Sequence, residues 1–223
     1  MLRRAITTAI AAAALGVTTA PAAARRPHPA FRCTTQTGQT ILADNQARIY
    51  ATGRGTYAGC GYRARHAITL GQIGSAGEAV VNLNNVVLVG SVAALNQATQ
   101  TAQAGYTFTV SVFDLRRGRL LRSLPTGAPS ASQLAFSSLA CYRYCAGVGP
   151  TTALVLKTDG AAAWIVNDNQ APDTPTYKVV RADAAGSPTV VAAGADIDPT
   201  SLALGRSTLY WQQAGATHSS QLV

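Results

Sequence analysis

One short pattern constrains this chain more than any other: an apolar run, a tight turn and a second apolar run. The clearest copy spans residues 154–165, with Asp159-Gly160 at its turn. An Asp-Gly pair accepts the positive φ values that a hairpin turn needs. Further copies occupy residues 47–57, 86–95 and 201–211. A lone hairpin cannot bury both of its apolar faces, so the repetition predicts units that stack on one another.

Further strand-like segments follow the hairpins. Residues 62–70, 106–114 and 177–183 come after the first three copies, and residues 119–121 and 189–192 extend the second and third. The early strands of a unit are apolar throughout, which is typical of strands buried on both faces. In the later strands apolar residues alternate with polar ones, which is typical of strands buried on one face. We therefore expect an all-β fold of antiparallel, four-stranded repeat units.

This pattern favours a small or partial β-propeller, in which four-stranded sheets stack face to face around an axis. The last copy is short of its outermost strand, and we expect residues 39–43 to supply that strand and tie the two ends together. The alternative is an open, sandwich-like stack of the same strands.

The hairpin at residues 154–165 resembles the repeat of WD40-like, TolB-type β-propellers, whose turn reads Ser-Pro-Asp-Gly. Here the turn reads Lys157-Thr-Asp-Gly160, so the Asp-Gly matches and the Ser-Pro does not. The last unit, residues 197–211, resembles units of uncharacterised secreted propeller-like proteins of actinobacteria. The resemblance implies a propeller fold and carries no catalytic residue across.

The chain begins like an exported protein. Arg3 and Arg4 precede an apolar run at residues 5–17, and an Ala-x-Ala pattern follows at residues 20–24. This is the layout of a secretory signal peptide over residues 1–24, since the run is too short for a membrane anchor. We expect a disordered leader at residues 25–38, then one domain at residues 39–223 with an insertion at about 125–150, and no further transmembrane segment.

Export favours disulfides for the four cysteines, Cys33, Cys60, Cys141 and Cys145. Three pairings are possible. Cys141 and Cys145 could close a small local loop, which would leave Cys33 to pair with Cys60. A zinc site is the alternative, but all-cysteine zinc sites use two close pairs, and Cys33 and Cys60 are far apart in sequence.

The charge of the chain is basic, at +9, and removal of Arg3 and Arg4 with the signal leaves +7. Such a charge could attract anionic cell-envelope polymers, but the preferred interpretation is that it keeps the protein soluble, because charge alone identifies no partner. The densest cluster comprises Arg116, Arg117, Arg119 and Arg122, which could bind a phosphate or carboxylate. The preferred interpretation is a solvated cluster paired in part with Asp114, because exposed arginine needs no ligand. Nucleic acid is not expected, because Phe113 is the only aromatic residue close to this charge.

No catalytic, metal-binding or cofactor-binding residue is predicted, because the few titratable side chains are scattered and form no known motif. Asp196 and Asp198 are interpreted as turn residues rather than calcium ligands. Asp159 is interpreted as a turn former. The large aromatic residues of the repeats are expected in the core rather than on a sugar-binding surface; they are Trp164, Tyr210 and Trp211.

The sequence therefore predicts a secreted, non-enzymatic scaffold or binding module, whose partner is an anionic envelope polymer or another protein. Two alternatives remain. One is a glycan-active hydrolase, which would require Asp159, Asp196 or Asp198 to share a cleft with Arg or His. The other is a surface adhesin that relies on the basic charge.

Overall fold

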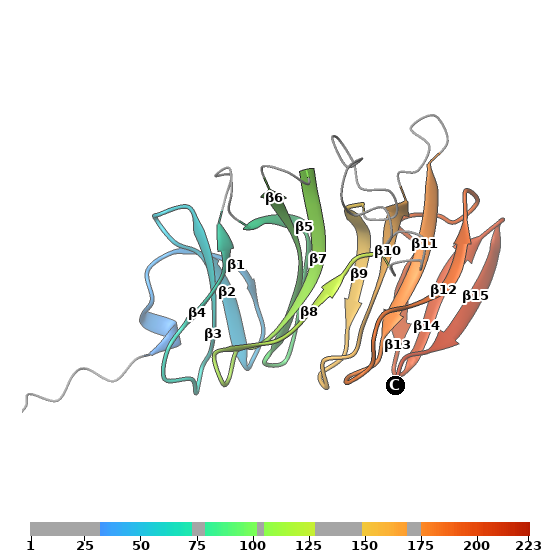
Figure 1. Ribbon diagram of the computed structural model, residues 1–223. Coiled ribbons are helices and arrows are strands. Elements are labelled where there is room, and N and C mark those ends of the chain that lie inside the picture. The colour runs from blue at the N-terminus through green and yellow to red at the C-terminus, as the bar shows by residue number, and fades with distance from the viewer. Residues whose placement is uncertain (1–31, 73–78, 102–104, 128–148, 169–174) are drawn as a thin grey trace, which may run out of the picture.

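The protein folds into β-sheets that lie side by side in a row (Figure 1). The computed structural model describes residues 32–72, 79–101, 105–127, 149–168 and 175–223. The first three sheets are antiparallel meanders of four strands and the last has three strands. β4 and β5 share a single parallel pair, Gln72 with Val80, which links the first two sheets at one edge. The prediction of an all-β fold built from antiparallel units is confirmed.

The strands follow one another in chain order within each sheet. Sheet 1 comprises β1 (Gln39–Ala43), β2 (Ala47–Ala51), β3 (Thr56–Gly61) and β4 (Ile68–Gln72). Sheet 2 comprises β5 (Ala79–Val89), β6 (Val92–Thr101), β7 (Gly105–Asp114) and β8 (Arg119–Pro125). Sheet 3 comprises β9 (Thr151–Leu156), β10 (Ala162–Asp168), β11 (Thr176–Ala182) and β12 (Thr189–Gly194). Sheet 4 comprises β13 (Ala203–Gly205), β14 (Thr208–Gln213) and β15 (Ala216–Gln221).

Each pair of neighbouring sheets encloses its own hydrophobic core, because the inner strands are apolar on both faces. In β10, Ala162, Trp164 and Val166 face sheet 2, whereas Ala163 and Ile165 face sheet 4. All five side chains are buried. The first strands of successive sheets also contact one another, from β1 through β5 and β9 to β13. The stacking of sheets therefore follows from the continuous apolar runs in the sequence.

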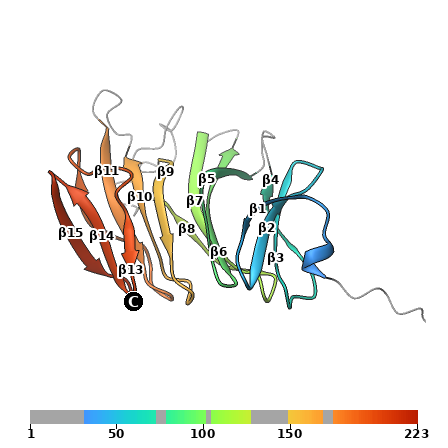
Figure 2. The same cartoon turned by 180° about the vertical axis from the view of Figure 1, so that it is seen from behind.

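The two ends of the chain do not share a sheet. β1 was expected to complete the last unit, but it pairs with β2, from Gln39 opposite Ala51 to Ala43 opposite Arg48. Sheet 4 instead gains its third strand from β15, which the sequence did not predict. Sheets 1 and 4 lie at opposite ends of the row in both views (Figures 1 and 2). The expectation that β1 ties the ends together is wrong.

The first hairpin lies one strand earlier than predicted. In sheets 2 to 4 the predicted hairpins are the first two strands, but residues 47–57 form the second and third strands of sheet 1. The equivalent first hairpin joins β1 to β2. Asp44 closes its turn, because its Oδ1 accepts hydrogen bonds from the N–H groups of Gln46 at 2.7 Å and Ala47 at 2.9 Å.

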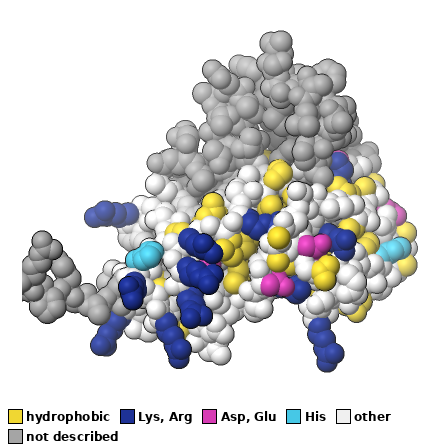
Figure 3. Space-filling model, turned by 60° about the horizontal axis from the view of Figure 1, so that its bottom comes forward, with side chains coloured by type: hydrophobic (Ala, Val, Ile, Leu, Met, Phe, Trp, Pro, Cys, Tyr) yellow, Lys and Arg dark blue, Asp and Glu magenta, His cyan; other side chains and the backbone are white. Residues whose placement is uncertain are grey.

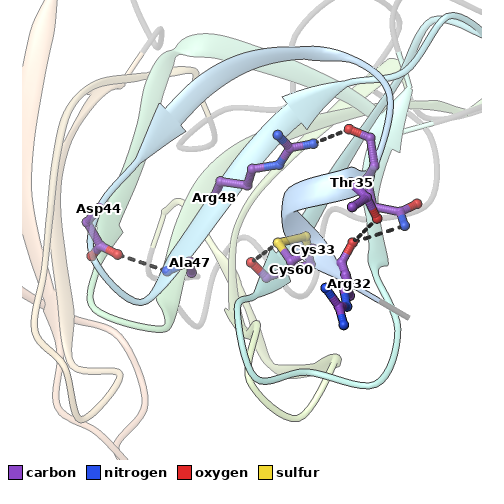
Figure 4. Close-up of a disulfide and its surroundings, with 8 residues drawn as sticks. Arg32, Cys33, Thr35, Asp44, Ala47, Arg48 and Cys60 are labelled. Atoms are coloured by element: carbon purple, nitrogen blue, oxygen red, sulfur yellow. Dashed lines mark hydrogen bonds between the residues drawn. A yellow bond between two sulfur atoms is a disulfide. The ribbon is translucent and has the colours of Figure 1, made fainter. Parts of the chain in front are cut away.

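An N-terminal segment covers the outer face of sheet 1 (Figure 4). Its short 3-10 helix, Cys33–Thr35, is joined to β3 by a disulfide between Cys33 and Cys60. Arg48 donates a hydrogen bond to the carbonyl of Gln36 and lies 4.6 Å from the centre of the Tyr50 ring. Residues 32–38 are thus ordered, which corrects the expected leader, while residues 25–31 lie outside the described part of the chain.

The structure confirms the disulfide between Cys33 and Cys60, and so these two cysteines are not zinc ligands. Cys141 and Cys145 lie outside the described residues, as does most of the insertion expected at residues 125–150. The two ends of this insertion lie together, because the hydroxyl of Thr126 donates a hydrogen bond to the carbonyl of Gly149 at 3.0 Å. The indole N–H of Trp164 also donates a hydrogen bond to the carbonyl of Thr126, at 2.6 Å.

Candidate functional site

Two loops from neighbouring sheets meet at one end of the row. The loop of residues 62–67 joins β3 to β4, and the loop of residues 115–118 joins β7 to β8. The N–H of Gly61 donates to the carbonyl of Leu115 at 2.9 Å, and His66 Nε2 lies 3.4 Å from the carbonyl oxygen of Gly118. We call residues 62–67 and 115–119 the basic loop pair.

Local interactions set the shape of the second loop. The Oδ1 of Asp114 accepts a hydrogen bond from the N–H of Arg117 at 3.0 Å, and its Oδ2 lies 3.5 Å from the Arg117 guanidinium. Gly118 has a φ of 61°, which favours glycine. A Cβ atom at Gly118 would also lie 2.3 Å from His66 Nε2, so a larger residue there would displace the exposed His66 ring from its place against this loop.

The basic loop pair exposes six basic side chains, and among the described residues Asp114, which is buried beneath the turn, is the one acid that forms an ion pair with them. The six are Arg63, Arg65, His66, Arg116, Arg117 and Arg119. Figure 3 shows basic side chains gathered over sheets 1 and 2, with acidic side chains further along the row. Among the described residues, Arg117 is the only one of these arginines in an ion pair. The surface therefore offers several guanidinium groups that can donate hydrogen bonds to an anion.

Arg122 has a different role from the other predicted arginines. Its guanidinium donates hydrogen bonds to the carbonyls of Asp183 and Gly186, so it fastens sheet 2 to sheet 3. Burial lowers the pKa of Arg122, and the charge of Asp183 opposes that shift. Three of the four predicted anion contacts, Arg116, Arg117 and Arg119, thus lie on the basic loop pair, and Arg122 lies at a joint between sheets.

Arg63, Arg65 and His66 are part of this surface although the sequence did not predict a site there. Their spacing within one turn was visible, but nothing in the sequence shows that this turn lies against the loop of residues 115–118. Stacking of sheets 1 and 2 brings together segments about 50 residues apart, as the contact between His66 and Gly118 at a separation of 52 residues shows.

An open groove of about 410 Å³ adjoins the basic loop pair between the outer strands of sheets 1 and 2. Leu70, Phe113 and Leu120 form its apolar part. Gln97 lies in the polar part, where its side chain donates to the carbonyl of Leu70 at 2.5 Å and accepts from the hydroxyl of Ser111. None of the described side chains that line the groove is titratable. The remaining lining residues are Thr69, Gly71, Gln72 and Ser123.

Of the three carboxylates that a hydrolase would need, Asp159 and Asp198 form turns, and Asp196 accepts a hydrogen bond from a side chain of β14. Asp159 Oδ1 accepts from the N–H of Ala161 at 2.9 Å, and Lys157 lies 3.0 Å from its Oδ2. Burial alone would raise the pKa of Asp159, but this hydrogen bond and the Lys157 ammonium together hold it below its usual value. Asp198 accepts hydrogen bonds from the N–H and hydroxyl of Thr200, which lower its pKa. Asp196 accepts from the side chain of Gln213 at 3.1 Å.

These interactions leave Asp159, Asp196 and Asp198 on separate turns. The described ranges contain no group of three or more His, Cys, Asp or Glu side chains that could hold a metal ion. Asp159 is therefore a turn former, as predicted.

The large aromatic residues divide between core and surface. Trp164 and Trp211 are buried as predicted, and Trp211 stacks on His218 with 5.8 Å between ring centres. Tyr210 was expected in the core, but it is 40% exposed because it points away from sheet 3. Its neighbours in β14, Leu209 and Trp211, occupy the buried face. The core prediction was wrong for Tyr210 alone.

The chain matches no model of a known protein family, and no curated protein matches it. Within the described residues, no helix is both long and apolar enough to cross a membrane.

Proposed function

We propose that the chain is a secreted, non-catalytic binding module whose basic loop pair holds an anionic polymer of the cell envelope. A phosphate-rich polymer is the favoured partner, because guanidinium groups bind phosphate oxygens in pairs of charge-assisted hydrogen bonds. Secretion rests on the signal-like pattern at residues 1–24.

A single observation carries this proposal. Five arginines and one histidine on two touching loops are exposed around one buried acid. Arg63 and Arg65 approach from sheet 1, and Arg116 and Arg119 approach from sheet 2. Because the loops belong to different sheets, one polymer could contact both at once, and several weak contacts on one chain add to give useful affinity.

Nucleic acid is a less suitable polymer for this surface. Proteins that bind single strands interleave arginines with exposed aromatic side chains, on which the bases stack. Phe113 is buried in the core between sheets 1 and 2. Tyr62, which is 36% exposed, is the one tyrosine, tryptophan or phenylalanine on the basic loop pair, so this surface offers one such side chain rather than a series interleaved with the arginines.

We also propose that the fold is a partial propeller. Its support is the resemblance of the hairpin at residues 154–165 to TolB-type repeats, together with successive four-stranded meanders whose first strands contact one another. In such a fold the four sheets would be blades, and the basic loop pair would lie on the loops of the first two blades.

Binding to a soluble phosphodiester polymer tests the proposed function. We expect the double variant Arg65→Ala/Arg119→Ala to bind at least roughly tenfold more weakly than wild type, since charge-assisted hydrogen bonds contribute about 1.5–3 kcal/mol each. The matched control is Arg54→Ala/Arg206→Asn, which removes two exposed arginines from other turns. Calorimetry at several salt concentrations measures all three proteins.

The control should bind like wild type, and binding of wild type should weaken as salt screens the charges. Equal loss in both double variants would show that net charge alone drives binding. Binding that persists at high salt would contradict an electrostatic site.

A further inference from the structure

The groove between sheets 1 and 2 lies beside the basic loop pair but has a different chemistry. Its lining comes from β4, β6, β7 and β8, and none of the described side chains in that lining carries a charge. It begins where the loops end, because Leu120 follows Arg119 in the chain and Thr69 lies three residues after His66. A polymer that is held by the basic loop pair can therefore extend directly into the groove.

A fixed amide group lies within the groove. The side chain of Gln97 donates one N–H to the carbonyl of Leu70, and its oxygen accepts a hydrogen bond from the hydroxyl of Ser111. These two hydrogen bonds join β6 to β4 and β7, and they hold the amide in one orientation. The amide has a second N–H, which has no hydrogen-bond partner within the described residues and can donate to a ligand.

Further uncharged polar groups lie on both sides of the groove. Thr69 is exposed and Gln72 is half-buried on β4, and Ser123 is exposed on β8. Their side chains form no hydrogen bond within the described residues. Hydroxyl and amide groups both donate and accept hydrogen bonds, as the hydroxyl groups of a ligand do. A phosphodiester oxygen can only accept, so this lining suits hydroxyl groups better than it suits phosphate.

The apolar part of the groove suits a ring with a hydrocarbon face. Leu120 is 48% exposed and lies opposite Phe113 in the pairing of β7 with β8. Sugar rings combine an apolar C–H face with hydroxyl groups around the edge. The volume of about 410 Å³ lies within the usual range of small-molecule sites, about 300–1,000 Å³. A lipid chain fits less well, because it would cover the polar groups of the groove without forming hydrogen bonds to them.

We propose that this groove binds a sugar unit of the same polymer whose phosphates contact the basic loop pair. The inference rests on the proposed function and narrows the ligand to sugars joined by phosphodiesters. The sugar packs its C–H face on Leu120 and forms hydrogen bonds with Gln97, Thr69 and Ser123. These contacts are uncharged, so they select the polymer, whereas the arginines provide the salt-dependent part of binding.

Two soluble oligomers with the same number of phosphodiester groups separate the two parts of the site. In one oligomer the phosphates join hexose units, and in the other they join propanediol units, which lack the ring and its hydroxyl groups. Calorimetry on the full chain should show roughly tenfold tighter binding of the hexose oligomer, the effect of one or two added hydrogen bonds. Added salt should weaken binding of both oligomers and leave the ratio of their affinities unchanged.

Two variants test whether the groove produces this preference. Ser123→Tyr places a large ring in the groove without a change of charge, and Leu120→Ser removes the exposed apolar side chain. Each should bring the ratio of affinities close to one. The matched control is Ser219→Tyr, which makes the same change at an exposed serine of β15 and should keep the preference. Thermal unfolding of each variant checks that the fold is intact.

The possible failures of the two proposals are distinct. If wild type bound both oligomers equally, or if both groove variants kept the preference, the sugar site would be wrong and the proposed function would stand. Tighter binding of the propanediol oligomer would also overturn the sugar site, since it would show that the groove favours an apolar ligand. If wild type bound neither oligomer, both proposals would be wrong.

Discussion

At the scale of single residues, acidic side chains in this chain shape turns. Asp44, Asp114, Asp159 and Asp198 each accept hydrogen bonds from backbone N–H groups two or three residues further on. Asp and Asn favour such turns because their short side chains reach their own backbone. These four are a large share of the nine acidic residues in the chain, and in the described residues their carboxylates serve local turns.

Asp159 gives a prediction about pH. Its pKa is lower in the folded state than in the unfolded chain, so its stabilising effect is present above the usual pKa of about 3.9 and is lost as pH falls through the folded value. Asp159→Asn should therefore cost about 0.5 kcal/mol or less at neutral pH, since the pair with Lys157 is partly exposed. Urea unfolding at pH 7 and pH 2 measures the free energy that the substitution costs at each pH. An equal cost at both pH values would contradict a stabilising role for the ionised Asp159 carboxylate.

Gly118 gives a prediction about the basic loop pair. Gly118→Ala should lower the free energy of unfolding by about 1–2 kcal/mol, because its φ of 61° disfavours alanine and a Cβ would meet the His66 ring. Gly55→Ala is a matched control, with a φ of 71° and open space around it. Thermal unfolding compares the two. Gly118→Ala should also weaken binding of phosphodiester polymer, and equal effects of both variants would show that contact with His66 is unimportant.

Sequence predicted the roles of Asp159 and Trp164 but not that of Tyr210. A turn former acts through residues next to it in the chain, so its local sequence suffices. Trp164 lies in a strand that is apolar on both faces, and it is buried whichever way it points. Tyr210 alternates with Leu209 and Trp211, so its burial depends on whether a further sheet follows sheet 4.

At the scale of elements, sequence located strands better than it located their partners. The first hairpin was misplaced because Gly53 and Gly55 give a strong turn signal, whereas the turn at Asp44 contains no glycine. β15 was missed because its sequence has no apolar face. The sequence did not predict the places of β1 and the N-terminal segment. The partner of β1 depends on which strand edge remains open after the sheets stack, and that of the N-terminal segment depends on which sheet face remains open.

The disulfide gives a prediction for the N-terminal segment. Cys33→Ser/Cys60→Ser should lower the free energy of unfolding by about 2–4 kcal/mol, the usual effect of losing such a cross-link. Burial raises the pKa of Tyr50 even though the Arg48 charge opposes this, so release of the segment should bring that pKa down toward its usual value. Ultraviolet titration measures the shift, and an unchanged Tyr50 would show that the segment stays in place without the bond.

At the scale of the whole molecule, the row has two different ends. The N-terminal segment and its disulfide cover the outer face of sheet 1. The outer face of sheet 4 is polar, with side-chain hydrogen bonds from Gln212 to Thr217 and from Gln221 to Thr208. Stacked repeats need such polar end units to stay soluble. Both ends are thus suited to an open row. Within this row, the packing of sheet 1 against sheet 2 brings the two loops of the basic loop pair together.

The distance between β1 and β13 tests this arrangement most directly. Spin labels at Thr40→Cys and Ala203→Cys, with Cys141 and Cys145 replaced by Ser, report the separation of the first strands of sheets 1 and 4. Stacked sheets lie about 10 Å apart, so three steps along the row place these strands ~30 Å or more apart. Pulsed electron paramagnetic resonance should give that long distance. A separation of ~10 Å would mean that the two end sheets are neighbours in a closed ring, and would contradict the open row.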